Sequence, residues 1–315
     1  MRISWFVLLL LCTGYAHADT NLTAAIENVR TTCGNISAEL TDMKKMAGIT
    51  TAVTGVGTVV SGVALGSGIT KAKIDTEQAE KQSELDKIMQ SAGFIKINSE
   101  SELLNILGGM YEQTNTEFGD IAAETIKSRQ QEISELEKKS KNLGNWRTGM
   151  LATSTATNIA GAVMSGANRV KGDLKQQINE CLTSVKTLSN IRMQARLSQT
   201  ASDMELERAE KIIRACDAWT TVDVSSINTK STGATISSGI GATTGLAGTI
   251  VSASANSNSV RDGDADKEKK LNTTANVLAG GTTLASGVAT IFNATQISAI
   301  KRAATVADEC EGALK

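Results

Sequence analysis

The sequence lacks several residue types on which common protein functions depend. It has no proline and one histidine, His17, in 315 residues, and aromatic residues make up 3% of the chain. Catalysis by Ser-His-Asp or Cys-His groups and histidine-ligated metal sites are excluded if that one histidine is removed with a leader. The absence of proline is typical of long uninterrupted helices, because an internal proline costs a helix about 3 kcal/mol.

A dominant charge of one sign is also absent. The chain has 32 basic and 33 acidic residues, so it has no single-sign field that would attract nucleic acid. No glycine motif for nucleotide phosphates is present. Ser298 and Lys301 match the S-x-x-K spacing of acyl enzymes, but the companion motifs are missing. We therefore expect no enzyme activity, cofactor, metal, nucleic-acid partner or small-molecule substrate.

The N-terminus has the features of a secretory signal peptide. Arg2 precedes an apolar run over residues 5–11, and Ala16-His17-Ala18 is an A-x-A cleavage site. The run is too short to cross a bilayer. We predict a signal peptide over residues 1–18 and an exported protein, either periplasmic or extracellular, whose mature chain contains no histidine.

Four cysteines remain after this cleavage: Cys33, Cys181, Cys216 and Cys310. An even number behind a signal peptide predicts two disulfides formed in an oxidising compartment. No C-x-x-C pair is present, which argues against a zinc ribbon.

Apolar residues recur at heptad spacing around the cysteines. One such series predicts a single helix over residues 22–43 and comprises Leu22, Ile26, Val29, Cys33, Ile36, Leu40 and Met43. Ser202 and Glu205 form a capping-box sequence at the start of the helix that carries Cys216.

Four segments contain no charged residue and are rich in Gly, Ala, Ser and Thr: Met46–Thr70, Thr148–Asn168, Ser231–Val260 and Leu271–Ile300. Small residues keep heptad spacing within them, which predicts tightly packed helices of the glycine-zipper kind. These positions are Gly48, Gly55 and Gly62 in the first segment, and Ala275, Ala279, Thr282, Ser286 and Ala289 in the last. Each segment also reaches the roughly 20 residues that a bilayer requires. We favour a permanently paired bundle core, and the alternative is a water-soluble bundle that re-exposes these helices to lipid, as pore-forming proteins do. A permanently integral protein with four spans is a third possibility, against which stands the heptad continuity from Leu22 through the first segment into the charged arm.

The cysteines and the uncharged segments share two centres of symmetry. Cys33 and Cys181 are equidistant from Leu107, which precedes Gly108-Gly109, and Cys216 and Cys310 are equidistant from Gly263. Two antiparallel hairpins would explain this, with residue i facing 214 − i in the first and 526 − i in the second. The turn between the hairpins should then lie near Gln199.

The predicted fold is all-α, with tandem antiparallel helical hairpins forming a four-helix bundle. The first hairpin covers residues 19–200 and includes a long protruding coiled-coil arm over 71–147, tipped at 107–109. The second covers 201–315, with its tip near 263. Two disulfide patterns join neighbouring helices, Cys33–Cys181 with Cys216–Cys310 or Cys33–Cys310 with Cys181–Cys216, and the sequence leaves both open.

Apolar side chains gather at the tip of the predicted arm, which suggests either a contact surface or a small closed core. The candidate contact residues are Phe94, Ile95, Leu103, Leu104, Leu107, Met110, Tyr111 and Phe118. We expect an exported, non-enzymatic scaffold or interaction protein that uses the arm to contact a protein partner or a second copy. The alternative is a membrane-active α-helical protein, similar to pore formers, that inserts the tip or the small-residue helices.

Overall fold

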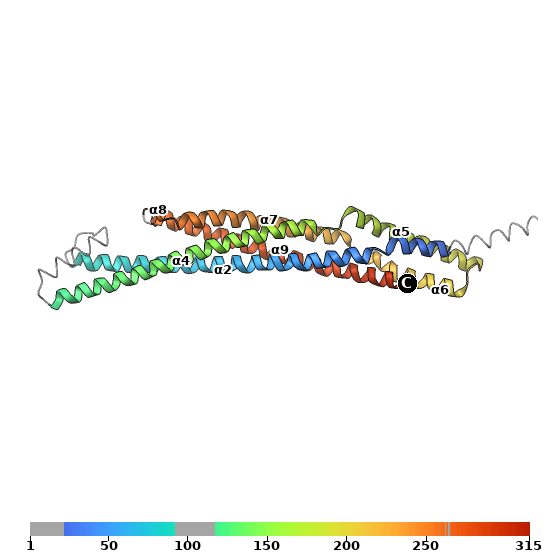
Figure 1. Cartoon of the computed structure of the whole chain (residues 1–315), viewed down its shortest axis with the longest axis horizontal. Coiled ribbons are helices and arrows are strands. Elements are labelled where there is room, and N and C mark those ends of the chain that lie inside the picture. Colours follow the sequence, from blue (N-terminus) through green and yellow to red (C-terminus); the bar gives the residue numbers. More distant parts are fainter. Residues whose placement is uncertain (1–21, 92–116, 262, 264) are drawn as a thin grey trace, which may run out of the picture. The chain divides into compact units, whose positions relative to one another are not determined.

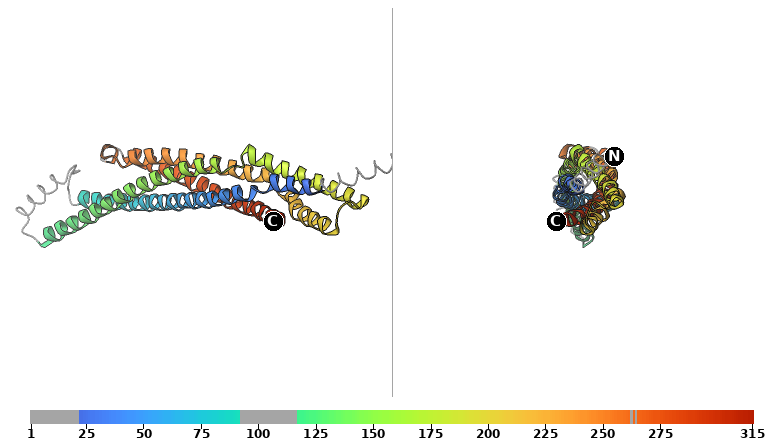
Figure 2. Two further views of the ribbon diagram at one scale, coloured as in Figure 1. Left: turned by 45° about the vertical axis from the view of Figure 1, so that its right-hand side comes forward. Right: turned by 90° about the vertical axis from the view of Figure 1, so that its right-hand side faces the viewer.

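The computed structural model describes residues 22–91, 117–261, 263 and 265–315, and all regular structure in these ranges is helical, as predicted (Figures 1 and 2). Residues 22–33 are helical. The remaining helices are α2 (Ile36–Ser91), α4 (Glu117–Ala167), α5 (Gly172–Ser198), α6 (Asp203–Asp217), the 3-10 helix η1 (Ala218–Thr221), α7 (Val224–Ala255), α8 (Asn258–Arg261) and α9 (Ala265–Leu314).

The helix predicted over residues 22–43 is interrupted, so that prediction was wrong in part. A turn at Gly34 and Asn35 separates residues 22–33 from α2, and the backbone N–H of Gly34 donates to the carbonyl of Arg30 at 3.0 Å. The apolar series itself is confirmed, because Leu22, Ile26, Val29, Cys33, Ile36 and Leu40 are all buried.

The turn predicted near Gln199 is confirmed. Helix α5 ends at Ser198, and Gln199 has a φ of 51°, in the left-handed region that often ends a helix. Helix α6 then begins with the predicted capping box. The Glu205 N–H donates to the Ser202 hydroxyl, and the Ser202 N–H donates to the Glu205 carboxylate at 3.0 Å.

The chain forms two compact units. Unit 1 contains Met1–Gly55, Asn158–Gly239 and Ala285–Lys315, and unit 2 contains Val56–Thr157 and Ile240–Leu284. Helices α2, α4, α7 and α9 contribute residues to both units. Unit 1 has a core of large apolar side chains that includes Trp219. In unit 2, Ala64, Leu151 and Ala279 form one apolar cluster, and Leu85 and Ile126 are also buried.

Contacts between helices follow the predicted register. In unit 2, Lys81 of α2 pairs with Glu132 of α4 at 2.7 Å, one position from the residue that 214 − i predicts. The hydroxyls of Thr244 in α7 and Thr282 in α9 lie 3.0 Å apart, as 526 − i predicts. Both contacts match the antiparallel register predicted for α2 with α4 and for α7 with α9.

The predicted small-residue series is correct on α9 and wrong on α2. Ala275, Ala279, Thr282, Ser286 and Ala289 are all fully buried. In contrast, a Cβ atom added at Gly48, Gly55 or Gly62 would meet nothing within 4 Å. The buried series of α2 instead comprises Ala47, Thr50, Thr54, Gly57, Ser61, Ala64, Gly68 and Lys71. Its steps of three and four residues are again those of coiled-coil packing.

Candidate membrane-embedded region

The usual distribution of polarity is reversed in the uncharged segments of unit 1. Buried side chains there carry hydroxyl or amide groups: Thr50, Thr54, Asn158, Ser165, Ser231, Ser238, Ser286, Asn293 and Gln296. The exposed side chains of the same helices are aliphatic, and Ile49, Ile159, Val163, Ile236 and Ile291 are 52–67% exposed. A surface of this kind is costly in water, since large contiguous apolar patches are rare on soluble monomers.

Unit 2 has the same reversal. Ser61, Ser154, Ser252 and Thr282 are fully buried. The exposed positions carry Val56, Val59, Val63, Ile240, Leu246, Ile250, Val277 and Leu284, which are 48–74% exposed. Both units thus place polar groups between helices and aliphatic groups outside.

Hydrogen bonds between helices satisfy several of the buried polar groups, and others such as Thr50 bond within their own helix. In unit 1, Asn293 of α9 donates to the hydroxyl of Thr54 in α2 at 3.3 Å and accepts from Ser165 of α4 at 3.1 Å. Ser286 donates to the Asn158 carbonyl oxygen at 2.9 Å. Such bonds are a common means of holding helices together where no hydrophobic effect operates between them, and each contributes about 0.6 kcal/mol on average in a membrane protein.

Exposed hydroxyls in these segments are satisfied within their own helix. Thr153 donates to the carbonyl of Gly149 at 3.0 Å, Thr243 to that of Ile240 at 2.9 Å and Ser254 to that of Ile250 at 2.9 Å. A threonine or serine that bonds in this way needs no water partner.

Glycines bring some of the helices close together. In unit 1, a Cβ at Gly161 of α4 would lie 2.6 Å from the Thr54 methyl carbon. In unit 2, one at Gly245 of α7 would lie 2.6 Å from the Thr155 hydroxyl oxygen. The close helix packing predicted from small residues therefore occurs, although at glycines other than those of the predicted α2 series.

A charged layer lies at one end of the uncharged segments, within unit 2. Lys71 is 1% exposed and pairs with Asp75 at 2.7 Å and Glu268 at 2.8 Å. Arg147 is fully buried and donates to Ser252 at 2.8 Å, Asn276 at 3.1 Å and Asn272 at 2.7 Å. Burial lowers the pKa of the Arg147 guanidinium to about 10, opposed by Asp75 and Glu268, so the group remains charged at neutral pH.

One exposed tryptophan accompanies this layer. Trp146 is 61% exposed and directly precedes Arg147. Tryptophan is enriched where a membrane meets water, because its ring is apolar and its indole N–H is polar.

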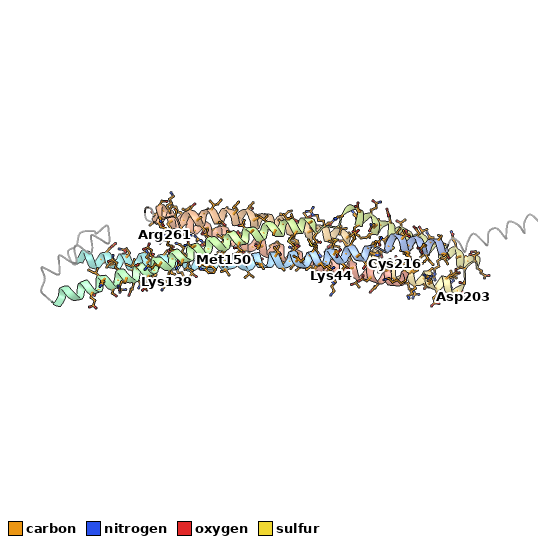
Figure 3. The ribbon with its side chains drawn as sticks, in the orientation of Figure 1. Lys44, Lys139, Met150, Asp203, Cys216 and Arg261 are labelled. Carbon is orange, nitrogen blue, oxygen red and sulfur yellow. A yellow bond between two sulfur atoms is a disulfide. The ribbon has the colours of Figure 1, made fainter. Side chains whose placement is uncertain are left out.

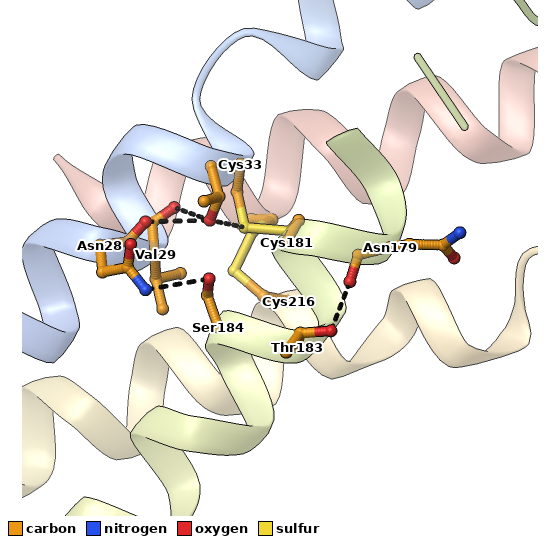
Figure 4. The surroundings of a disulfide bond; sticks show 10 residues. Asn28, Val29, Cys33, Asn179, Cys181, Thr183, Ser184 and Cys216 are labelled. Atoms are coloured by element: carbon orange, nitrogen blue, oxygen red, sulfur yellow. Dashed lines mark hydrogen bonds between the residues drawn. A yellow bond between two sulfur atoms is a disulfide. The ribbon is translucent and has the colours of Figure 1, made fainter. Parts of the chain in front are cut away.

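The two disulfides belong to unit 1, and Figure 4 shows the surroundings of the Cys33–Cys181 bond. Cys33 bonds to Cys181 and Cys216 bonds to Cys310, which is the first of the two patterns that the sequence left open. The sulfur atoms of Cys33, Cys181 and Cys310 are all buried and lie within 4.8 Å of one another. Beside them Asn28 donates to the Ser184 hydroxyl at 3.1 Å. The pairs are consistent with the oxidising, exported environment predicted from the cysteine count.

The predicted contact residues at the arm tip lie outside the described residues. They are Phe94, Ile95, Leu103, Leu104, Leu107, Met110 and Tyr111; Phe118 belongs to α4, but its side chain is also outside the description. Their role stays a prediction.

Two stretches of the described helices are long and apolar enough to cross a membrane, Leu22–Lys87 and Ala265–Leu314. Only 28% of the apolar window of each is buried, whereas the core helix of a soluble protein is mostly buried. Among the described residues, the other long helices, α4 and α7, are not apolar enough to meet this criterion of length and hydropathy, because Gly, Ser and Thr lower their mean hydropathy. No protein-family model, curated protein or solved structure matches the chain.

The reversed polarity is the feature that sequence reasoning missed. The signal was available, since hydroxyl and amide residues occupy the heptad positions of these segments while Val, Ile and Leu lie between them. Recognising it required knowing which positions face a neighbouring helix.

Proposed function

We propose that this chain is an exported, membrane-embedded helical protein in which the four uncharged segments form a four-helix bundle within lipid. It works as a non-enzymatic scaffold, with the disulfide-tied residues on one side of the membrane and the arm on the other. The observation that carries the proposal is the reversed polarity of all four segments, with aliphatic side chains outside and hydrogen-bonded hydroxyls and amides between the helices.

The lengths of the segments support this proposal. They contain 25, 21, 30 and 30 residues without a charge, against about 20 needed for a spanning helix. Val, Ile and Leu each favour insertion by about 0.3–0.6 kcal/mol near the helix centre. Most of the hydroxyl and amide groups that would oppose insertion are paired between helices or within them, which lowers their cost in lipid, although the Ser238 hydroxyl and the Gln296 amide oxygen have no partner among the described residues.

Four spans also account for the compartment of the cysteines. Each crossing moves the chain to the other side of the membrane, so two crossings return it to its starting side. One side would therefore hold residues 22–45, 169–230 and 301–315, and the other side would hold residues 71–147 and 261–270. All four cysteines belong to the first set. A secreted N-terminus would place this set in the oxidising compartment, where disulfides form.

The arm would supply the contact with a protein partner. Lys81 bonds to Glu132, and Asp75 accepts a hydrogen bond from Ser140, so α2 and α4 remain paired beyond the uncharged segments. A paired helical extension of this kind suits an interaction module.

The test is protease protection in vesicles. The mature, oxidised protein would be reconstituted into phosphatidylcholine vesicles, floated, and digested with a protease of broad specificity. We expect protected fragments of about 20–30 residues from the four uncharged segments, and their loss when detergent dissolves the vesicles. Digestion to small peptides in intact vesicles would overturn the proposal. A stable water-soluble oligomer that does not float would also overturn it, because a second copy would then cover the aliphatic surface.

A further inference from the structure

Seven basic residues of unit 1 lie within three positions of the ends of the uncharged segments. They come from α2, α7, α9 and the connection between α4 and α5. We name this set the basic collar, and it comprises Lys44, Lys45, Arg169, Lys171, Lys230, Lys301 and Arg302.

Hydrogen bonds around Asn168 place the start of the collar at one level. The Gln296 side chain of α9 donates to the Asn168 carbonyl at 2.7 Å. The Asn168 amide lies 3.2 Å from the carbonyl oxygen of Met43 and 3.1 Å from the backbone nitrogen of Ala47, in the orientation that satisfies both atoms. The adjacent Val170 N–H donates to Asn228 of α7 at 2.7 Å.

The basic residues of the collar are close in sequence to the residues that make these contacts. Lys44 and Lys45 lie between the two α2 positions that Asn168 contacts, and Arg169 is its neighbour in the chain. Lys301 and Arg302 are five and six residues beyond Gln296, which is about 8–9 Å along a helix. Seven cations from four segments are therefore concentrated in one short zone.

Few carboxylates balance this zone. Lys44, labelled in Figure 3, is exposed, as are the other members except the half-buried Lys230. Among the described residues, Lys45 has an ion-pair partner, Asp42 at 3.3 Å, while the other six members have none. The nearby Asp173 belongs to the first turn of α5, and Asp223 bonds to Ser225 and also attracts Lys230.

The opposite end of the segments is different. In unit 2, Lys71 is paired with Asp75 and Glu268, and Arg261 is paired with Glu137 at 3.2 Å. Carboxylates such as Asp75, Asp266 and Glu268 are interspersed with the cations at that end, although the exposed Lys73, Lys269 and Lys270 have no ion pair among the described residues. The collar, in contrast, presents six cations without an ion pair beside an uncharged, aliphatic surface.

We propose that the basic collar binds the headgroups of anionic phospholipids. This inference rests on the proposed membrane insertion, and it names the lipid class that this side of the protein recognises. The collar supplies ammonium and guanidinium donors at the depth where a phosphate would lie if the adjacent aliphatic side chains were in the acyl chains. Each such cation strengthens association with an anionic surface by about fivefold.

The experiment measures partitioning of the full-length mature protein between buffer and two kinds of vesicle. One kind is phosphatidylcholine alone, and the other contains about one third phosphatidylglycerol. We expect the native protein to bind the anionic vesicles at least 100-fold more strongly at low salt, with the difference falling as salt is raised.

The collar variant is Lys44→Gln, Arg169→Gln, Lys171→Gln, Lys301→Gln and Arg302→Gln combined. A matched control changes five exposed cations of unit 1 outside the collar: Lys175→Gln, Lys186→Gln, Arg196→Gln, Arg208→Gln and Lys211→Gln. We expect the collar variant to lose the preference for anionic vesicles and the control to keep most of it. A smaller variant, Lys301→Gln with Arg302→Gln, should lose about tenfold or more, and guards against misfolding of the larger one.

The outcomes separate the two proposals. If the collar and control variants lose the same preference, or neither loses any, the collar is not a lipid site. Insertion into phosphatidylcholine would then still support the membrane proposal. If the native protein enters neither kind of vesicle, both proposals fail together.

Discussion

A charge introduced at Leu284 distinguishes a lipid-facing surface from a water-facing one. Leu284 is 74% exposed and lies near the middle of the fourth uncharged segment. In water, replacing so exposed a residue by aspartate should change the free energy of unfolding by less than about 0.5 kcal/mol. In the centre of a bilayer, an aspartate costs about 2.5–3.5 kcal/mol and the lost leucine about 0.5 kcal/mol more.

The sum of about 3–4 kcal/mol corresponds to a 100- to 1,000-fold loss in the partition coefficient for inserted protein, since 1.4 kcal/mol is tenfold. The assay is flotation with phosphatidylcholine vesicles at several lipid concentrations. Leu197→Asp is the matched control, because Leu197 is 81% exposed but lies in α5, outside the uncharged segments. Equal partitioning of Leu284→Asp, Leu197→Asp and the native protein would refute the reasoning.

Three further predictions concern the protein's stability. Gly68→Ala should destabilise the protein by about 1–3 kcal/mol in thermal unfolding, because the new Cβ would lie 1.9 Å from the Asn276 amide oxygen. Gly62→Ala is the control and should be neutral or slightly stabilising, because nothing lies within 4 Å of its new Cβ. Equal effects of the two substitutions would contradict the helix contacts described. Removing the Cys33–Cys181 disulfide as a double serine variant should cost about 3–5 kcal/mol, since the bond closes a loop with a sequence separation of 148, and unchanged denaturant unfolding would count against a native bond. Hydrogen bonds from Ser202 hold the pKa of Glu205 below its usual value, so the stabilisation of the start of α6 should be complete above about pH 4.3 and be lost as the pH falls through the lowered pKa. Ser202→Ala should reduce this pH dependence when the unfolding of unit 1 is followed by circular dichroism. An unaltered pH profile would argue against the capping box.

Much of the local structure could be predicted from the sequence, because heptads and caps are local signals. The apolar series around Cys33, the turn at Gln199 and the Ser202–Glu205 capping box each depend on a few neighbouring residues. The hairpin register could also be predicted, since the symmetric positions of the cysteines and uncharged segments allow few antiparallel alignments.

The buried face of α2, the helix break at Gly34 and the disulfide pattern could not be predicted, because the sequence is compatible with more than one arrangement of each. On α2, small residues occur on both sides of the helix, so the spacing of Gly48, Gly55 and Gly62 could not show that Thr50 and Thr54 face the neighbours instead. The break at Gly34 falls within an unbroken apolar series. The disulfide pattern was ambiguous because each cysteine had two acceptable neighbours.

The central claim is that exposed aliphatic residues such as Val163 in α4 and Val59 in α2 face lipid. The depth in the bilayer of a spin label at each position tests this claim most directly. All four cysteines of the described chain are paired, so a new cysteine there provides a unique labelling site. In phosphatidylcholine vesicles, we predict that labels at Val163 and Val59 collide frequently with oxygen, which dissolves in lipid, and rarely with a water-soluble nickel chelate, while a label at Leu197 shows the reverse. Nickel accessibility at Val163 and Val59 equal to that at Leu197 would contradict the account.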